Sequence, residues 1–296
     1  MDNMYQVELL NSSDSDLWDA YVKSHAEGTF FHLSGWQRVI EKTFSHACFF
    51  LLAKHDNNIC GVLPLVEVKS KLFGHALVST PFCVYGGVIA DNDEIKRSLE
   101  AKAIEYAEEL AVDHLELRYL SEQNNGMLLK QAHATFMCEL ADDAEGILAA
   151  VKKKQRAVIR HSLKNELASE MTSNIDEFYE LLSESYRNLG TPIFTKVFFK
   201  QLVKEFGSDV DICVVKTKEN QPSTAVMNFY FNDTVLPYYG GGSADARHVK
   251  SADFMYYQVM CHARQNGYTK YDFGRSKNDS GPYKYKKNWG MEPQPL

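Results

Sequence analysis

The sequence lacks the features of an exported, membrane-spanning or disulfide-bonded protein. No apolar stretch reaches the roughly 18 residues that a membrane-crossing helix needs, and the N-terminus has neither the basic segment nor the long apolar segment of a signal peptide. The six cysteines lie far apart and form no C-x-x-C pair, which is typical of reduced cytoplasmic thiols. We therefore expect a cytoplasmic protein that does not insert into a membrane.

The motifs of several catalytic classes are also missing. None of the ten histidines forms an H-x-H or H-x-x-x-H pair, so no metal site is predicted. The chain has no G-x-S-x-G, G-x-x-x-x-G-K or G-x-G-x-x-G sequence, which argues against a nucleophile elbow, a P-loop and a dinucleotide fingerprint. We expect no permanently bound cofactor. Because the formal net charge is −7, any anion-binding surface has to be local.

What the sequence does contain is an internal repeat. Residues 84–91 (VYGGVIAD) resemble residues 238–245 (YYGGGSAD), at an offset of 154 that continues without a gap. Recurrence at a fixed offset is the mark of a duplicated unit. We expect the two copies to superpose with Tyr85 lying on Tyr239.

Further elements recur around these segments in the same order. Each copy has a hairpin pattern before the Tyr-Gly-Gly sequence, then a helical stretch and a strand after it. A tandem duplication explains this order better than chance does. The hairpins are expected at residues 49–68 and 211–231, and the strands at residues 115–119 and 269–273.

The pattern predicts an α+β fold in which each copy has a mostly antiparallel sheet flanked by helices. An acidic link at residues 141–145 is followed by basic residues, so we place the domain boundary there and predict domains at residues 1–145 and 146–296. Helix ends are also visible. Ser34 with Gln37 forms a capping-box pattern, and Gly190 ends a helix.

A row of basic residues follows the predicted boundary. Lys152, Arg156, Arg160 and Lys164 recur every four residues, so a helix would place all four on one face. Like charges at this spacing repel, which favours an anionic partner such as a phosphorylated carrier, a nucleotide sugar or an RNA backbone. The alternative is a solvated basic face that helps solubility.

The C-terminal segment carries a second group of polar residues. A strand ends at Asp272 and is followed by Arg275, and residues 281–290 then alternate aromatic residues with lysines. A carboxylate and several cations at the end of a buried strand are suited to a ligand-binding floor. An exposed edge hairpin fits the same pattern. Residues 239–241 are either a bulge that a ligand approaches or ordinary turn glycines.

Six segments of the chain match one known family, at residues 34–40, 79–87, 238–243, 271–274, 281–283 and 285–290. They resemble the Fem-type aminoacyltransferases, which form peptidoglycan cross-bridges and consist of two GNAT-like acyltransferase domains. The resemblance covers nearly the whole chain and implies a tandem of two GNAT-like domains. The N-terminal segments are most similar to the FemAB-like proteins of exosortase (PEP-CTERM) exopolysaccharide clusters.

The resemblance also implies a catalytic group. The family's aromatic-Lys-x-x-aromatic-Gly motif falls on residues 285–290, and its lysine, Lys286 here, is thought to stabilise the tetrahedral intermediate. A fixed cation beside the developing oxyanion lowers the barrier to acyl transfer. We expect Asp272 to hold Lys286 or to contact the incoming amine, and Tyr239 to hydrogen-bond the acyl donor.

The expected substrate contacts are less closely matched to the family. The family's phosphate-binding lysine corresponds to Arg38 or Lys42, and its second-half arginine corresponds to Lys196 or Arg187. The other candidate substrate-binding residues are Arg275, Tyr85 and the basic row. Neither half has the Gln/Arg-x-x-Gly-x-Gly/Ala loop that binds the pyrophosphate of acetyl-CoA, which favours aminoacyl-tRNA over acyl-CoA as the donor.

The sequence thus predicts an N-acyltransferase that acts on a cell-envelope or exopolysaccharide precursor. Its partners would be a phosphate-bearing small molecule or carrier, with tRNA as a candidate. Two alternatives stay open: an acyl-CoA-dependent N-acetyltransferase of a small amine, and a non-catalytic RNA-binding or scaffold protein that has kept the fold.

Overall fold

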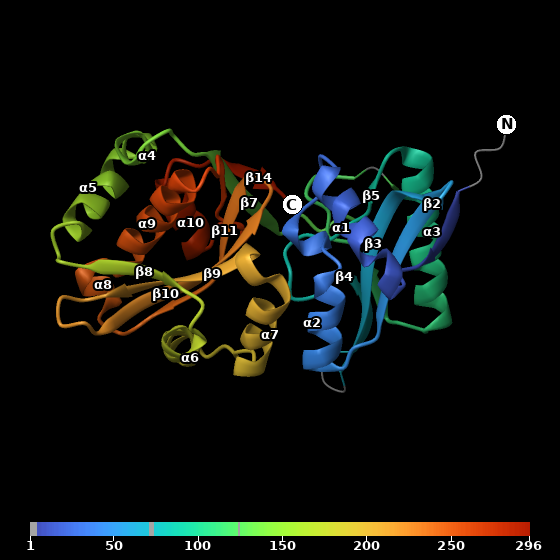
Figure 1. The fold of residues 1–296 in the computed structure, drawn as a ribbon, viewed down its shortest axis with the longest axis horizontal. Helices are drawn as coiled ribbons and strands as arrows, with labels where there is room; N and C mark the ends of the chain where they lie inside the picture. Colours follow the sequence, from blue (N-terminus) through green and yellow to red (C-terminus); the bar gives the residue numbers. More distant parts are fainter. Residues whose placement is uncertain (1–4, 71–73, 124) are drawn as a thin grey trace. The chain divides into compact units, whose positions relative to one another are not determined.

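The computed structural model describes residues 5–70, 74–123 and 125–296. The chain divides into two compact units, Met1–Leu128 and Leu129–Leu296 (Figure 1). This boundary lies before the predicted one because β7 (His133–Glu139) belongs to the second unit. There it pairs with β12 (Lys270–Asp272), β13 (Ser276–Lys277) and β14 (Pro293–Pro295).

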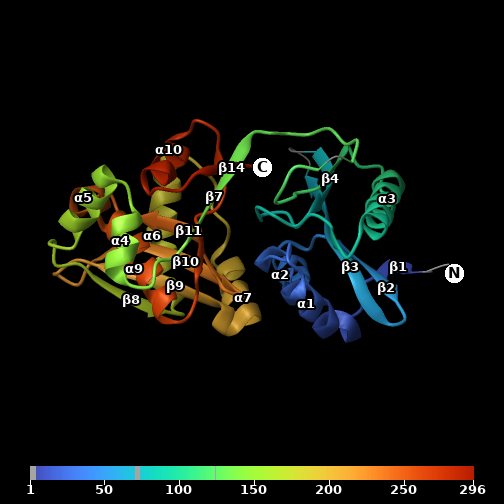
Figure 2. The same cartoon turned by 90° about the horizontal axis from the view of Figure 1, so that it is seen from above.

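Unit 1 contains a mixed sheet in the strand order β1-β2-β3-β4-β6, with β5 also paired to β3. All pairs are antiparallel except β4 with β6. Helices α1 and α2 lie on one side of the strands and α3 on the other (Figure 2). The elements are β1 (Gln6–Leu9), η1 (Ser12–Asp14), α1 (Ser15–Ser24), η2 (Phe30–His32), α2 (Gly35–Phe44), β2 (Cys48–His55), β3 (Asn58–Ser70), β4 (Gly74–Ser79), β5 (Ile89–Ala90), α3 (Asp93–Glu109) and β6 (His114–Glu116).

Unit 2 contains a larger mixed sheet, in which β8, β9, β10, β11 and β12 are neighbours in that order and β7 follows β12. Helices α6 and α7 lie on one side of this sheet, and α4, α5, α9 and α10 on the other (Figure 1). The remaining elements are α4 (Ala144–Ala150), α5 (Lys153–Ser162), β8 (Ala168–Thr172), α6 (Ile175–Leu189), α7 (Lys196–Phe206), η3 (Gly207–Asp209), β9 (Val210–Lys216), β10 (Pro222–Phe231), β11 (Thr234–Gly242), α8 (Ala246–Val249), α9 (Ser251–Gln265) and α10 (Gly281–Asn288).

The two units repeat one topology. Unit 1 runs β1, α1, α2, β2, β3, β4, α3, β6, and unit 2 runs β8, α6, α7, β9, β10, β11, α9, β12. In both sheets the first four of these strands are antiparallel neighbours and the last strand is parallel to the fourth. The structure therefore confirms the predicted α+β tandem.

The two Tyr-Gly-Gly segments, however, lie in different elements. Tyr239 lies inside the continuous strand β11. In unit 1 the chain leaves the sheet after Ser79 and rejoins β3 at Ile89, and Tyr85 lies in the intervening segment. A constant offset therefore does not align the two copies.

Local sequence explains several element ends. Asn174 caps α6 by accepting a hydrogen bond from the backbone N–H of Asp176, and Gly190 ends this helix with a φ of 66°. The predicted capping box at Ser34 is wrong. Its N–H and hydroxyl donate to the carboxylate of Asp19 instead, at 2.7 and 3.1 Å.

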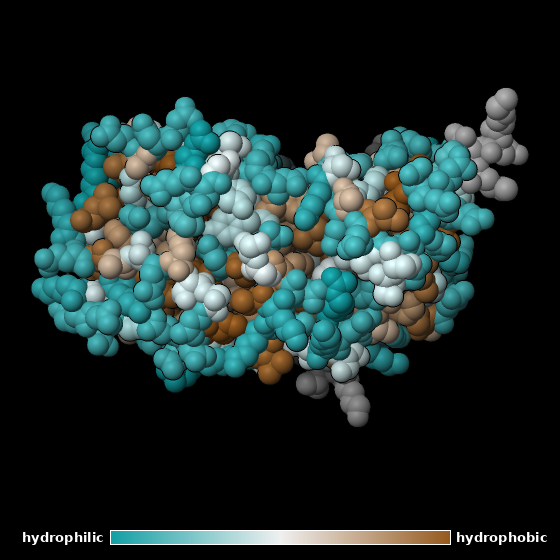
Figure 3. All heavy atoms as spheres, in the orientation of Figure 1, coloured by the Kyte–Doolittle hydropathy of each residue, from teal (hydrophilic) through white to brown (hydrophobic). Residues whose placement is uncertain are grey.

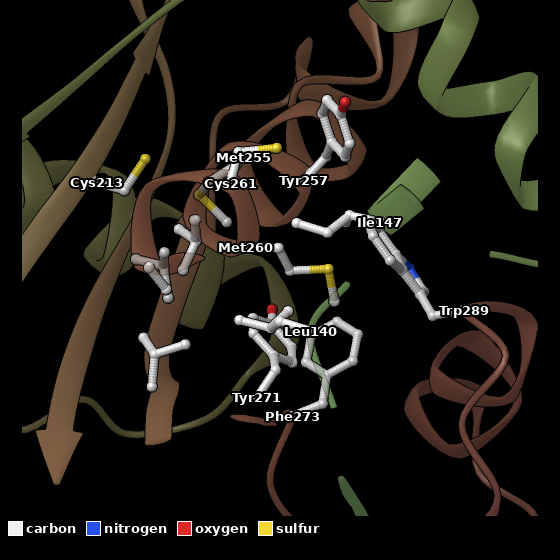
Figure 4. Close-up of a cluster of buried hydrophobic side chains, with 14 of the residues drawn as sticks. Leu140, Ile147, Cys213, Met255, Tyr257, Met260, Cys261, Tyr271, Phe273 and Trp289 are labelled. Carbon is white, nitrogen blue, oxygen red and sulfur yellow. The ribbon is translucent and has the colours of Figure 1, made fainter. Parts of the chain in front are cut away.

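Unit 2 has a large aromatic and aliphatic core between its sheet and α9. Tyr271, Phe273 and Trp289 lie beside Met260 of α9 (Figure 4), and all four side chains are buried. Each such side chain stabilises the fold by about 1.5–3 kcal/mol. This core fixes the end of β12 and the helix α10, which carry the candidate site.

Among the described residues, no helix combines the length and the apolarity needed to cross a bilayer. The face drawn in Figure 3 is covered mainly by hydrophilic residues, with apolar side chains visible between them.

Candidate active site

A β-bulge follows strand β12. Asp272 pairs with Met137 of β7, whereas Ser276 pairs with Ala134, so the β12–β13 side carries one extra residue. Gly274 lies in this bulge with a φ of 73°, a conformation that favours glycine. Bulges are common beside active sites because they redirect the chain at the end of a strand.

Two charged side chains hold this bulge. The Asp272 carboxylate accepts hydrogen bonds from the Gly274 N–H at 2.7 Å and from the Thr135 hydroxyl at 3.3 Å. The Lys286 Nζ donates to the carbonyl oxygens of Gly274 and Arg275, at 2.9 and 3.1 Å. The structure therefore brings Lys286 and Asp272 together around one turn.

Lys286 reaches the bulge from α10 and lies about one turn after the start of this helix. The sequence favours a helix that begins there. The Ser280 side chain accepts from the backbone N–H of Tyr283, and proline occupies the first turn. The ammonium lies 5.4 Å from the ring centroid of Phe273 and 5.8 Å from that of Phe136. Burial lowers the pKa of Lys286 to about 8, and the Asp272 charge opposes this shift.

The hydrogen-bond count of Lys286 has a chemical consequence. A protonated lysine has three N–H donors, and the two bulge carbonyls use two of them. The third can be donated to a substrate oxygen that develops negative charge. The same contacts also make Lys286 a structural link between α10 and the strand.

The strands beside this turn separate. The parallel pairing of β11 with β12 covers Thr234 with Lys270 and Val235 with Tyr271. Beyond Asp272, the chain enters the bulge and follows β7, while β11 continues beside β10 to Gly242. Lys286 thus lies at the point where two parallel strands part, which is a frequent position for ligand sites in α/β sheets.

Tyr239 is not directed toward Lys286. A Cβ on Gly240 would meet the Tyr256 hydroxyl of α9, whereas one on Gly241 would meet the backbone of α6 at Leu182. Tyr239 lies two residues before Gly241 and therefore shares its face of the sheet. Its ring packs against four phenylalanines: Phe198 and Phe199 of α7, Phe194 just before this helix, and Phe229 of β10.

The basic row does not form a single helical face. Only Arg156 and Arg160 lie within α5; Lys152 is its N-cap residue, and Lys164 follows its last turn. Repulsion between like charges four residues apart in the helix is therefore limited to Arg156 and Arg160. Lys152, Arg160 and Lys164 are exposed, and the buried side of α5 is formed by Gln155, Ile159 and Ser162.

Two residues of this row have contacts within the unit. The Arg156 guanidinium donates to the carbonyl of Val151, at 3.1 and 3.2 Å, and so satisfies the carbonyl of the C-cap residue of α4. The Lys152 Nζ lies 3.9 Å from the Glu292 carboxylate. Arg160 and Lys164 are the better candidates for an anion contact.

The other predicted substrate contacts are dispersed. In unit 2, the Arg275 carbonyl is a partner of Lys286, and the Lys196 ammonium pairs with Asp176 at 2.7 Å. In unit 1, Arg38 lies on α2, and Tyr85 is 1% exposed in the core.

Sequence reasoning missed a polar group inside the core of unit 2. The buried Asp253 carboxylate accepts hydrogen bonds from the Tyr285 hydroxyl at 2.9 Å and from the Gln155 amide. A signal was present, because Asp253 is the one carboxylate in the helical segment 251–265, most of whose residues are apolar. This network joins α5, α9 and α10 and fixes the helix that carries Lys286.

Unit 1 has a cavity of about 150 Å³ near the end of its own parallel strand pair. Its lining includes Glu27, His32, Gly87, Tyr119 and Ser121. His32 is 3% exposed. Its Nε2 must donate to the Gly87 carbonyl, 2.9 Å away, so its Nδ1 accepts from the backbone N–H of Thr29.

This buried histidine predicts an acid-sensitive unit 1. Burial lowers the pKa of His32 to about 4 from 6.5, so the unfolded chain binds the proton first. Its contribution to stability is complete above pH 6.5 and is lost as the pH falls toward 4, at about 1.4 kcal/mol per pH unit. Denaturant unfolding at pH 7 and pH 5 measures this slope. The variant His32→Gln should show a smaller slope, and the control His114→Gln, at an exposed histidine of the same unit, should not; equal slopes would contradict the prediction.

Residues 147–287, all within unit 2, match the model of the acetyltransferase (GNAT) domain. The tandem fold and this match define the chain as an acyltransferase of the GNAT type. No curated protein sequence matches the chain.

Solved structures with the same fold cover both units. FemX has a TM-score of 0.73 at 17% identity, over 98% of this chain and 95% of its own. The C-terminal domain of a putative lysylphosphatidylglycerol synthetase from Agrobacterium fabrum has a TM-score of 0.64 at 13% identity, over 97% and 91%. A tandem GNAT protein from the clavulanic acid biosynthesis pathway has a TM-score of 0.58 at 10% identity, over 99% and 96%. At these identities the similarity establishes the fold alone.

Proposed function

We propose that the protein transfers an aminoacyl group from a carrier to an amine of a cell-envelope precursor. The observation that carries this proposal is Lys286, a partly buried ammonium with one donor left over where two parallel strands part. Two solved structures support the choice of reaction: FemX, which shares its name with the Fem-type aminoacyltransferases that the sequence resembles, and the lysylphosphatidylglycerol synthetase domain, which is named for an aminoacylated lipid. Exopolysaccharide precursors are a second acceptor class, on the sequence resemblance alone.

The chemistry needs few protein groups. The acceptor nitrogen attacks the acyl carbonyl carbon, a C–N bond forms, and negative charge moves to the carbonyl oxygen, where Lys286 donates its third N–H. The C–O bond to the carrier then breaks, and the leaving hydroxyl takes the proton that the amine loses. Asp272 orients Lys286 by shaping the bulge that binds it.

The carrier we favour is tRNA. Exposed cations at Arg160 and Lys164 provide a local contact for phosphates in a chain of net charge −7. We place the reaction in the cytoplasm, where aminoacyl-tRNA is found and where the six free cysteines would stay reduced.

The pKa of Lys286 predicts how the activity changes with pH. An oxyanion-stabilising lysine has to be protonated, so kcat/KM for the donor should fall as the pH rises, by half near pH 8. A general base at this position would give the opposite slope. The measurement is kcat/KM for the donor, at saturating acceptor, from pH 6.5 to 9.5, with melting temperatures recorded at each pH. A rate that rises through pH 8 would contradict the proposed role.

One transfer assay tests the function. The purified chain is incubated with an extract of nucleotide-linked envelope precursors and with either radiolabelled aminoacyl-tRNA or radiolabelled acetyl-CoA. Label moving from tRNA into a precursor supports the proposal. Transfer from neither donor by a folded protein would overturn it and leave the non-catalytic alternative.

Acyl-CoA is the second candidate donor because the matched domain model is an acetyltransferase model. Transfer from acetyl-CoA alone, onto a small amine, would establish this alternative.

A further inference from the structure

Tyr256 of α9 presents a hydroxyl group to the backbone of β11. Its oxygen lies 3.4 Å from the position that a Cβ on Gly240 would take. Among the residues that the structure describes, this hydroxyl has no hydrogen-bond partner, and the side chain is partly exposed. Its neighbours differ: the Tyr257 hydroxyl donates to the Ala144 carbonyl at 3.0 Å, and the Tyr285 hydroxyl to Asp253 at 2.9 Å.

The ring of Tyr256 is fixed beside the candidate active site. Its centroid lies 4.7 Å from that of Phe273 and 6.3 Å from those of Tyr285 and Trp289. The Lys286 ammonium contacts the same Phe273 ring, at 5.4 Å. The Tyr256 ring and the Lys286 ammonium therefore both contact the side chain of Phe273.

The surroundings of this hydroxyl favour a cation. The Asp253 carboxylate lies one turn earlier on α9, and its charge adds to burial in raising the pKa of Tyr256 to about 12. The phenol therefore stays neutral and keeps lone pairs that can accept a hydrogen bond. Aromatic faces and a nearby carboxylate both attract an ammonium group.

We propose that the Tyr256 hydroxyl accepts a hydrogen bond from the α-ammonium group of the aminoacyl donor. Tyr256 thereby selects aminoacyl over simple acyl groups, because a polar group left unpaired in the site penalises the analogue that lacks the amine. This inference rests on the proposed function and adds a specificity residue to it. Glycine at position 240 leaves the space of one methyl group beside the hydroxyl, since a Cβ there would lie 3.4 Å from the hydroxyl oxygen and from Val226 Cγ2.

The test compares glycyl-tRNA with acetyl-tRNA, which differ by the amino group alone. Wild-type protein should prefer the glycyl donor. In Tyr256→Phe, kcat/KM for the glycyl donor should fall about tenfold or more, as expected for a lost hydrogen bond to a charged group, while the value for the acetyl donor stays within about twofold.

Two further variants test whether the donor preference depends on the Tyr256 hydroxyl. Tyr257→Phe, on the adjacent residue, removes a structural hydrogen bond and should leave the donor preference unchanged. Gly240→Ala places a methyl group beside the Tyr256 hydroxyl and should reduce the same preference. An equal loss for both donors in Tyr256→Phe, or no loss for the glycyl donor, would overturn the inference. If the wild type uses neither donor, the proposed function itself fails.

Discussion

Replacing Lys286 with methionine should lower kcat by about a hundredfold or more, as loss of one oxyanion-stabilising donor usually does. Methionine keeps most of the length and apolar contact of the side chain and removes the ammonium. The loss should appear in kcat and kcat/KM together, because the contact forms in the transition state. The measurement is single-turnover and steady-state transfer at saturating donor and acceptor.

The structure requires a stability control, because Lys286 also ties α10 to the bulge carbonyls. Losing these hydrogen bonds should destabilise unit 2 by about 1–3 kcal/mol without unfolding it. Lys287→Met, the next residue of the same helix, is the matched control, since its ammonium lies over the Tyr283 ring and not at the bulge. Wild-type turnover in Lys286→Met would exclude the catalytic role. A large fall in melting temperature in Lys286→Met but not in Lys287→Met would show that the role of Lys286 is structural.

Most of the fold could be predicted from the sequence because its periodicities are local. The hairpins around residues 55–58 and 217–221 and the helices ending at Gly190 and Gly207 all have turn or cap residues where the structure needs them. The domain boundary could not be predicted in this way. β7 follows unit 1 in the chain but pairs with strands more than a hundred residues later. No local sequence pattern indicates so distant a partner.

The candidate site was only partly predictable for the same reason. Lys286 and Asp272 were found because a motif and a strand end mark them, and both lie at the bulge. The bulge itself depends on a one-residue register shift against β7, which the sequence does not reveal. Tyr239 is predicted to hydrogen-bond the acyl donor, but its ring packs against Phe198 and Phe199 of α7, because strand residues alternate between the two faces of the sheet.

Reversing the charges of Arg160 and Lys164 together should weaken tRNA binding by a few kcal/mol, because each charge-assisted phosphate contact contributes about 1.5–3 kcal/mol. These two positions are exposed and four residues apart: Arg160 lies in the last turn of α5, and Lys164 follows its C-cap residue. Arg156 is left unchanged because its guanidinium donates hydrogen bonds to the Val151 carbonyl. Filter binding of aminoacyl-tRNA to Arg160→Glu/Lys164→Glu gives the affinity at several salt concentrations.

The salt dependence separates a phosphate contact from a general charge effect. Two lost phosphate contacts should reduce the slope of log K against log salt by about 1.4–1.8. Lys200→Glu/Lys204→Glu is the matched control, with the same charge change at the same spacing on α7, where both lysines are exposed. Equal losses in the two double variants would show only the effect of net charge. An unchanged affinity in the folded Arg160→Glu/Lys164→Glu protein would leave α5 as a solvated basic surface, and the anion would have to bind elsewhere.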